Sequence, residues 1–173
     1  MAVEIEAIAE RLIAAYDRTS TLAPITASTP QLSIDDGYRV LADIEKRRRA
    51  QGWQPVGRKI GFTNTSIWAR YGVSAPLWAH VWAHTVHFAE NGEAALPLQS
   101  LVQPRIEPEV VFGLRGPVPL TDDACEIMSS VEWIAPGFEI VQCHFPDWKF
   151  AAADCTAAFG LAWGAGDRDA ACG

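Results

Sequence analysis

The first 55 residues carry the hydrophobic spacing of amphipathic helices. Apolar side chains recur three or four positions apart over 5–16 and again over 34–44. Between these stretches, two prolines with neighbouring Ser and Thr residues predict a loop. Ser33 followed by Asp36 is typical of a capping box that opens the second helix. We therefore expect a helical region over residues 1–55.

Beyond Pro55 the pattern changes to short apolar runs that glycine and proline interrupt. Such runs are typical of β-strands, and they lie at 58–63, 81–88, 109–114 and 138–143. A capping pattern at 121–123 with apolar positions over 127–134 predicts a helix that Pro136 ends. The segment 162–173 has the pattern of neither strand nor helix. Helices followed by strands predict the α+β class.

The composition is that of one globular domain. Of the 173 residues, 49% are hydrophobic and 20% are charged, and a chain of this length buries roughly 70% of the surface that it exposes when unfolded. No apolar run approaches the roughly 20 residues of a membrane-spanning helix. The acidic start of the chain lacks the basic region and apolar stretch of a secretory signal. We therefore expect a cytoplasmic protein without a membrane partner.

The charge balance also excludes a class of partner. A net charge of -7 and a pI near 5.0 argue against nucleic-acid binding, because phosphate recognition needs a concentrated positive surface. The basic run at 46–49 is interpreted as the end of a helix rather than as an anion-binding patch. None of the four cysteines forms a CxxC pair, so we expect reduced thiols, with neither a disulfide nor a zinc knuckle.

Two glutamates lie where an apolar strand should exclude charge. Glu107 and Glu109 are two residues apart in the stretch 103–112, so a strand would present both on one face. Like charges this close need a cation or a shared proton, and Mg²⁺ or Mn²⁺ accepts carboxylate oxygens. Glu139, inside another apolar run, adds a third candidate ligand. Pro108 cannot donate to a sheet ladder, which predicts an edge strand or a bulge.

Three further residues are candidates for chemistry, each with a structural alternative. Lys59 alternates with apolar neighbours, and a lysine beside carboxylates shuttles protons or polarises a carbonyl; the alternative is a surface lysine. His144 follows the last strand-like run, so it would either reach the carboxylates or occupy a turn. Asp154 is interpreted as a substrate contact, or as an acceptor behind one, with an ordinary helix or loop aspartate as the alternative.

The histidines offer a metal site that we do not expect. His80, His84 and His87 have the spacing of zinc ligands on one helix face. Their neighbours are β-formers, and in a strand the last two would face opposite sides.

Three ordered motifs resemble one known family. They are Gly57–Thr63, Gln103–Glu109 and Pro136–Val141, and Asp147–Trp148 and Ala153–Asp154 also fit. Together they resemble the branch of the fumarylacetoacetate hydrolase superfamily that contains 2-keto-4-pentenoate hydratases and 4-oxalocrotonate decarboxylases. The resemblance implies a helical region over 1–55, followed by a fumarylacetoacetase-like mixed β-roll that forms a catalytic domain over 56–173.

The resemblance also implies a function. Glu107, Glu109 and Glu139 would hold Mg²⁺ or Mn²⁺, which grips a small 2-oxo acid, and Lys59 and Glu109 would be catalytic. The expected reaction is the hydration of 2-oxo-4-enoic acids such as 2-keto-4-pentenoate, in aromatic-compound degradation, by a homo-oligomer if the fold is complete. The alternatives are decarboxylation of an oxalocrotonate-like diacid, acylpyruvate hydrolysis, and an inactive fragment that only associates with intact subunits.

The substrate end of the site departs from the family. The resemblance implies that Lys59, Asp154 and His144 contact the substrate. Family members tend to carry Arg at the position of His144 and Asn at that of Cys155, and the loop 71–80 resembles a less characterised subgroup.

The length of the chain also differs from that of family members. Family chains resemble this one as far as Leu161 and then continue through a further third, with a glycine-rich segment, that completes the β-roll. We therefore expect an incomplete roll whose sheet exposes an edge and part of its apolar face. For the tail 162–173 the hypothesis is a frameshift, because from Trp163 onward a frame shifted by one base can encode a family-like apolar run. The DNA sequence of the gene would test it.

Overall fold

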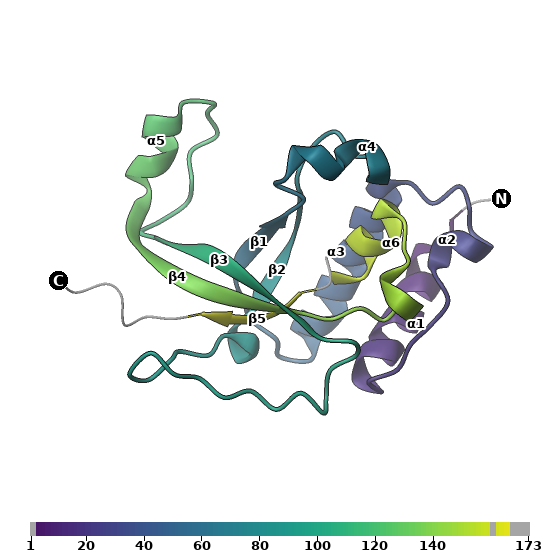
Figure 1. Ribbon diagram of the computed structural model, residues 1–173. Helices are drawn as coiled ribbons and strands as arrows, with labels where there is room; N and C mark the ends of the chain where they lie inside the picture. The colour runs from purple at the N-terminus through teal and green to yellow at the C-terminus, as the bar shows by residue number, and fades with distance from the viewer. Residues whose placement is uncertain (1–2, 160–161, 167–173) are drawn as a thin grey trace.

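The computed structural model describes residues 3–159 and 162–166 of the chain. The α-helices among them are α1 (Ile5–Asp17), α2 (Ile25–Ser28), α3 (Ile34–Ala50), α4 (Trp68–Tyr71), α5 (Ala124–Ser129) and α6 (Ala152–Ala157). The strands are β1 (Pro55–Gly61), β2 (Leu77–Trp82), β3 (Arg105–Leu114), β4 (Val131–Val141) and β5 (Ala162–Gly166). Short 3₁₀ turns are η1 (Thr65–Ile67), η2 (Ala83–Thr85) and η3 (Pro146–Trp148). Figure 1 shows α1, α2, α3 and α6 gathered on one side of the molecule and the strands on the other.

The helical layer forms as predicted and contains the larger hydrophobic cluster. Leu12 of α1 and Ile44 of α3 are fully buried in it, as their helical spacing requires. Gly37 lies where α3 meets α6, and a Cβ at this position would be 2.9 Å from the carbonyl oxygen of Ala153. The missing side chain therefore permits the close approach of the two helices.

Helix α3 begins and ends where the sequence predicts, and one arginine at its end is unexpectedly buried. Ser33 and Asp36 form the predicted capping box: the Asp36 N–H donates to Ser33 Oγ at 3.0 Å, and the Ser33 N–H donates to the Asp36 carboxylate at 3.2 Å. The basic run ends the helix, but Arg48 is only 3% exposed. Its guanidinium pairs with Asp17 of α1 and lies 4.2 Å from the centre of the Trp53 ring. This arginine therefore joins α1 to α3.

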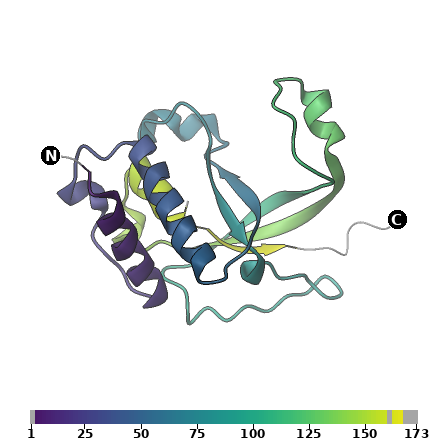
Figure 2. The same ribbon diagram turned by 180° about the vertical axis from the view of Figure 1, so that it is seen from behind.

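Strands β1 and β2 form an antiparallel ribbon that packs next to α3 (Figure 2). The Trp78 N–H of β2 donates to the Tyr38 hydroxyl of α3 at 3.2 Å. The strand predicted over 81–88 is wrong for most of its length, because β2 ends at Trp82 and a 3₁₀ turn follows. Trp82 is the last residue with a partner on β1, namely Pro55, and β-forming residues without a partner strand do not extend a sheet.

Strands β3, β4 and β5 form an antiparallel sheet in that order. Among the described strands β3 is an edge, with Pro108 opposite Phe138 and a bulge between Gly113 and Leu114. The edge that Pro108 predicted is therefore confirmed.

Two local predictions are wrong in this sheet. The helix predicted to run to Pro136 covers only Ala124–Ser129, because the residues from Val131 onward belong to β4 and pair with β3. Cross-strand pairing outweighs the helical spacing of these residues, several of which are β-formers. The tail was expected to form no strand, yet Ala162–Gly166 is β5 and pairs with β4. The rest of the tail, 167–173, lies outside the described residues, and the frameshift remains a hypothesis about the gene.

One face of the β3–β4 hairpin is apolar and exposed. Side chains on a strand alternate between the two faces, so this face is opposite to the one that carries the glutamates. Its exposed members, between 48% and 62% accessible, are Ile106, Val110, Phe112, Ile134 and Phe138. The expectation of an exposed apolar sheet face is therefore confirmed.

The described elements combine helices with small antiparallel sheets, so the α+β class is confirmed. Within this part of the chain, no helix is both long enough and apolar enough to cross a membrane.

Candidate metal centre and cavity

The hairpin brings three carboxylates together. Glu107 and Glu109 project from one face of β3, and Glu139 of β4 is the cross-strand partner of Glu107. One carboxylate oxygen from each residue lies within 4.8 Å of the others. Among the described residues this is the one group of three or more metal-ligating side chains that lies so close together. The antiparallel register, not the sequence spacing, supplies the third carboxylate.

The three carboxylates differ in burial. The apolar runs around all three predict strands in which the carboxylates are buried. All three do lie in strands, but Glu107 and Glu109 are exposed and only Glu139 is nearly buried, at 9%. The prediction is wrong for the first two because described residues cover little of β3, whose side chains are mostly exposed.

Lys59 approaches this cluster from the other sheet. Its Nζ lies 3.1 Å from Oε2 of Glu139, and both side chains are at most 15% exposed. Burial raises the pKa of Glu139; the positive charge of Lys59 opposes this shift, and the charges of Glu107 and Glu109 add to it. The other oxygen of Glu139, Oε1, is buried without a hydrogen-bond partner among the described residues. Three convergent carboxylates, of which Glu139 has an unsatisfied oxygen, fit a hard divalent cation.

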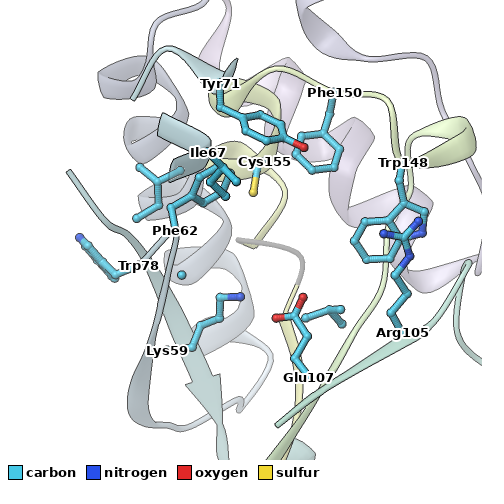
Figure 3. Close-up of a pocket in the computed structure, with 13 residues that line it drawn as sticks. Lys59, Phe62, Ile67, Tyr71, Trp78, Arg105, Glu107, Trp148, Phe150 and Cys155 are labelled. Atoms are coloured by element: carbon cyan, nitrogen blue, oxygen red, sulfur yellow. The ribbon is translucent and has the colours of Figure 1, made fainter. Parts of the chain in front are cut away.

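A cavity of about 230 Å³ lies between the two sheets and the helical layer. Figure 3 shows Lys59 and Glu107 at its lower end, with the amine and the carboxylate directed toward each other. Tyr71 and Phe150 lie at the upper end, and their rings stack 6.0 Å apart. Pockets for drug-sized ligands are typically about 300–1,000 Å³, so this cavity suits a small organic acid.

The cavity lining contains residues that the sequence reasoning missed. The aromatic ones are Phe62, Tyr71, Trp78, Trp148 and Phe150, and Arg105 adds a positive charge. Phe62 and Trp148 have positive φ angles of 58°, a conformation that costs bulky residues energy and clusters at functional sites. Arg105 had a signal in the sequence: it lies two residues before Glu107 and so on the same strand face. The aromatic residues come from separate parts of the chain, among them α4, β2 and η3, and had no such signal.

His144 lies apart from the carboxylates. It is 2% exposed, its Nδ1 is 2.8 Å from the carbonyl oxygen of Ser20, and its ring is 6.0 Å from that of Tyr16. Burial lowers its pKa and favours the neutral ring. The structure therefore places His144 in the helical layer and outside the cavity lining.

Asp154 is also outside the lining. Its carboxylate is fully buried and accepts hydrogen bonds from the Thr26 N–H at 2.9 Å, the Thr26 hydroxyl at 2.6 Å and the Ala151 N–H at 2.9 Å. It therefore ties α2 to the start of α6. Its neighbour Cys155 does line the cavity, and burial raises the pKa of that thiol to about 12, which keeps it protonated.

The three histidines of the zinc pattern do not gather. His80 Nε2 lies 3.0 Å from Glu45 of α3, and the ring of His84 packs against Trp53 at 4.2 Å. Because α3 and the tryptophan hold these two rings, the described residues do not form the zinc group that helical spacing would produce.

Comparison with known proteins shows which sequences this chain resembles. No protein-family model matches the chain. Over 157 residues it is 31% identical to the 2-hydroxyhexa-2,4-dienoate hydratase of Comamonas testosteroni, covering 88% of this chain and 58% of the relative. It is 33% identical over 136 residues to a 4-oxalocrotonate decarboxylase of a Pseudomonas species, covering 75% and 52%. The resemblance to the hydratase and decarboxylase family is confirmed.

The fold agrees with that of a family member. A 4-oxalocrotonate decarboxylase from Pseudomonas putida G7, solved with magnesium and adipate, superposes with a TM-score of 0.84 at 21% identity. The match covers 92% of this chain and 60% of that one. The chain thus spans between about half and two thirds of the length of the family members that it matches.

Proposed function

We propose that the chain carries the active site of a metal-dependent lyase that hydrates 2-oxo-4-enoic acids such as 2-keto-4-pentenoate. The observation that carries this proposal is the cluster of three carboxylates beside Lys59 at the end of a small cavity. The family members named above include a hydratase of a closely related dienoate. We further propose that residues 56–173 are part of a fumarylacetoacetase-like mixed β-roll that works as a homo-oligomer.

The proposed cofactor is Mg²⁺ or Mn²⁺, held by Glu107, Glu109 and Glu139. The donor set fits such an ion, because hard cations take carboxylate oxygens and Oε1 of Glu139 has no other described partner. When bound, the cation would polarise the 2-oxo group of the substrate and stabilise the negative charge that develops there. The magnesium in the decarboxylase of similar fold is consistent with this assignment.

The residues of the chain supply the remaining functions. Lys59, whose ammonium group lies 3.1 Å from the Glu139 carboxylate, would move a proton at the 2-oxo end of the substrate. The aromatic rings at the upper end of the cavity exclude bulk water from the carbon chain. Asp154 and His144, which do not line the cavity, are proposed to position α6 and the loop after β4 rather than to contact substrate.

Decarboxylation of an oxalocrotonate-like diacid is the second candidate. It is favoured by the 33% identity to a 4-oxalocrotonate decarboxylase. The same carboxylates and the same lysine would serve both reactions, because each needs the 2-oxo group as an electron sink.

The test is whether the purified chain with Mg²⁺ turns over 2-hydroxypenta-2,4-dienoate. Turnover is measured as the loss of diene absorbance. We expect Glu109→Gln to abolish metal binding, measured by calorimetry, and turnover together. Glu132→Gln is the matched control, since Glu132 is an exposed glutamate of β4 outside the cluster. Metal binding that survives Glu109→Gln unchanged would refute the ligand assignment, and a metal-loaded, folded chain without turnover would refute the activity.

A further inference from the structure

Arg105 is the one charged residue of the cavity lining that has no ionic partner among the described residues. The charged lining residues are Lys59, Arg105 and Glu107. Lys59 forms its ion pair with Glu139, and Glu107 belongs to the carboxylate cluster. No carboxylate of another described residue lies within 4.0 Å of the Arg105 guanidinium. An arginine that faces a cavity and forms no ion pair is available to an anionic ligand.

Arg105 is held in one orientation by an aromatic platform. Its Cζ lies 4.0 Å from the centre of the Trp148 ring, and Figure 3 shows the guanidinium over that ring at the side of the cavity. Stacking occupies the face of the guanidinium and leaves its edge N–H groups free, in the fork geometry that matches a carboxylate. Restraint before binding also lowers the entropy that binding costs.

The platform is itself fixed to the start of β3. The Trp148 Nε1–H donates to the carbonyl oxygen of Gln103 at 3.1 Å, and the Asp147 N–H donates to Gln103 Oε1 at 3.0 Å. The side-chain amide of Gln103 in turn donates to the carbonyl oxygens of Cys143 and Phe145. These bonds hold Trp148 in its positive-φ conformation next to Arg105.

The charge balance of the site favours an anion at this position. Arg105 precedes Glu107 by two residues on one strand face, which is about 7 Å along β3. With a divalent cation bound, the three carboxylates and Lys59 carry no net charge. Arg105 then leaves the site with one positive charge, which matches a single carboxylate.

We propose that Arg105, stacked on Trp148, binds a carboxylate of the 2-oxo acid and so determines which acids the site accepts. This inference rests on the proposed function. The carboxylate comes either from C1, next to the 2-oxo group, or from the far end of a diacid.

The experiment measures binding of two unreactive acids to the Mg²⁺-loaded chain by calorimetry. Pyruvate carries only the C1 carboxylate, whereas 2-oxoglutarate adds a distal one. We expect Arg105→Gln to raise the dissociation constant by about tenfold or more, which is the effect of losing a charge-assisted hydrogen bond, and to leave the Mg²⁺ affinity unchanged. Arg58→Gln is the matched control, because Arg58 is exposed and stacks on the lining residue Trp78 at 4.4 Å but does not line the cavity.

Each outcome decides the proposal. Weaker binding of both acids to Arg105→Gln supports recognition of the C1 carboxylate, and weaker binding of 2-oxoglutarate alone supports a distal subsite. Unchanged binding of both, or an equal loss in Arg58→Gln, overturns the role of Arg105 while leaving the proposed function intact. Arg105-dependent binding without turnover of the dienoate overturns the proposed function alone.

Discussion

Asp154 allows a sharp test of whether a buried carboxylate is structural or contacts substrate. It is fully buried and accepts three hydrogen bonds, two from backbone N–H groups and one from the Thr26 hydroxyl. Replacing Asp154 with Asn leaves one acceptor oxygen and puts an amide N–H₂ at the other position. If the amide takes the place of Oδ1, it opposes the Thr26 N–H; if it takes the place of Oδ2, it opposes the Ala151 N–H and meets the Thr26 hydroxyl.

The expected cost follows from that geometry. Either orientation leaves one buried backbone N–H without an acceptor, which costs about 1–3 kcal/mol of unfolding free energy. Asp154→Ala removes all three acceptor contacts and is expected to cost about 3–5 kcal/mol. The loss falls on the junction of α2 and α6, so the helical layer is destabilised as a whole.

Urea unfolding followed by far-ultraviolet circular dichroism measures these changes. Asp147→Asn is the matched control, because Asp147 is 75% exposed in its ion pair with Lys149; we expect it to change stability by less than about 0.5 kcal/mol. The reasoning is refuted if Asp154→Asn unfolds at the wild-type urea concentration and instead weakens binding of 2-oxo acids. That result would make Asp154 a substrate contact.

Two further predictions concern the β3–β4 hairpin. Burial raises the pKa of Glu139 above its ordinary 4.5 despite Lys59, so the metal-free fold loses stability as pH rises above 4.5 and this carboxylate ionises. In EDTA at pH 7, Glu139→Gln should therefore unfold at a higher urea concentration than wild type. This difference in urea midpoint should disappear below pH 4.5. A difference in midpoint that does not depend on pH would contradict the reasoning. Val110 is 61% exposed on the apolar hairpin face, so compared with wild type Val110→Lys should bind less of a hydrophobic dye and should self-associate less when measured by sedimentation. Unchanged dye binding and unchanged self-association would show that this face is not the surface through which the chain binds dye or associates.

Local features of the fold were predictable because they depend on near neighbours. The capping box of Ser33 and Asp36 and the apolar stripes of α1 and α3 rest on contacts between residues three or four apart. The shared face of Glu107 and Glu109 follows from the two-residue period of any strand. The helix predicted to extend to Pro136 failed because the same residues pair with β3, and no local pattern records that pairing.

The sequence by itself determined which residues are candidates for the proposed chemistry: a pair of glutamates on one strand face, a third carboxylate elsewhere, and a lysine among apolar neighbours. Only the tertiary structure decided how they meet. The register of β3 against β4 sets Glu139 opposite Glu107, and the approach of β1 brings Lys59 to 3.1 Å from it. Contacts between residues far apart in the chain also place Arg105 on Trp148, while Asp154 and His144 pack into the helical layer. Such contacts form because elements pack to bury apolar surface and to satisfy buried polar groups, and that balance is settled only when the whole fold is assembled.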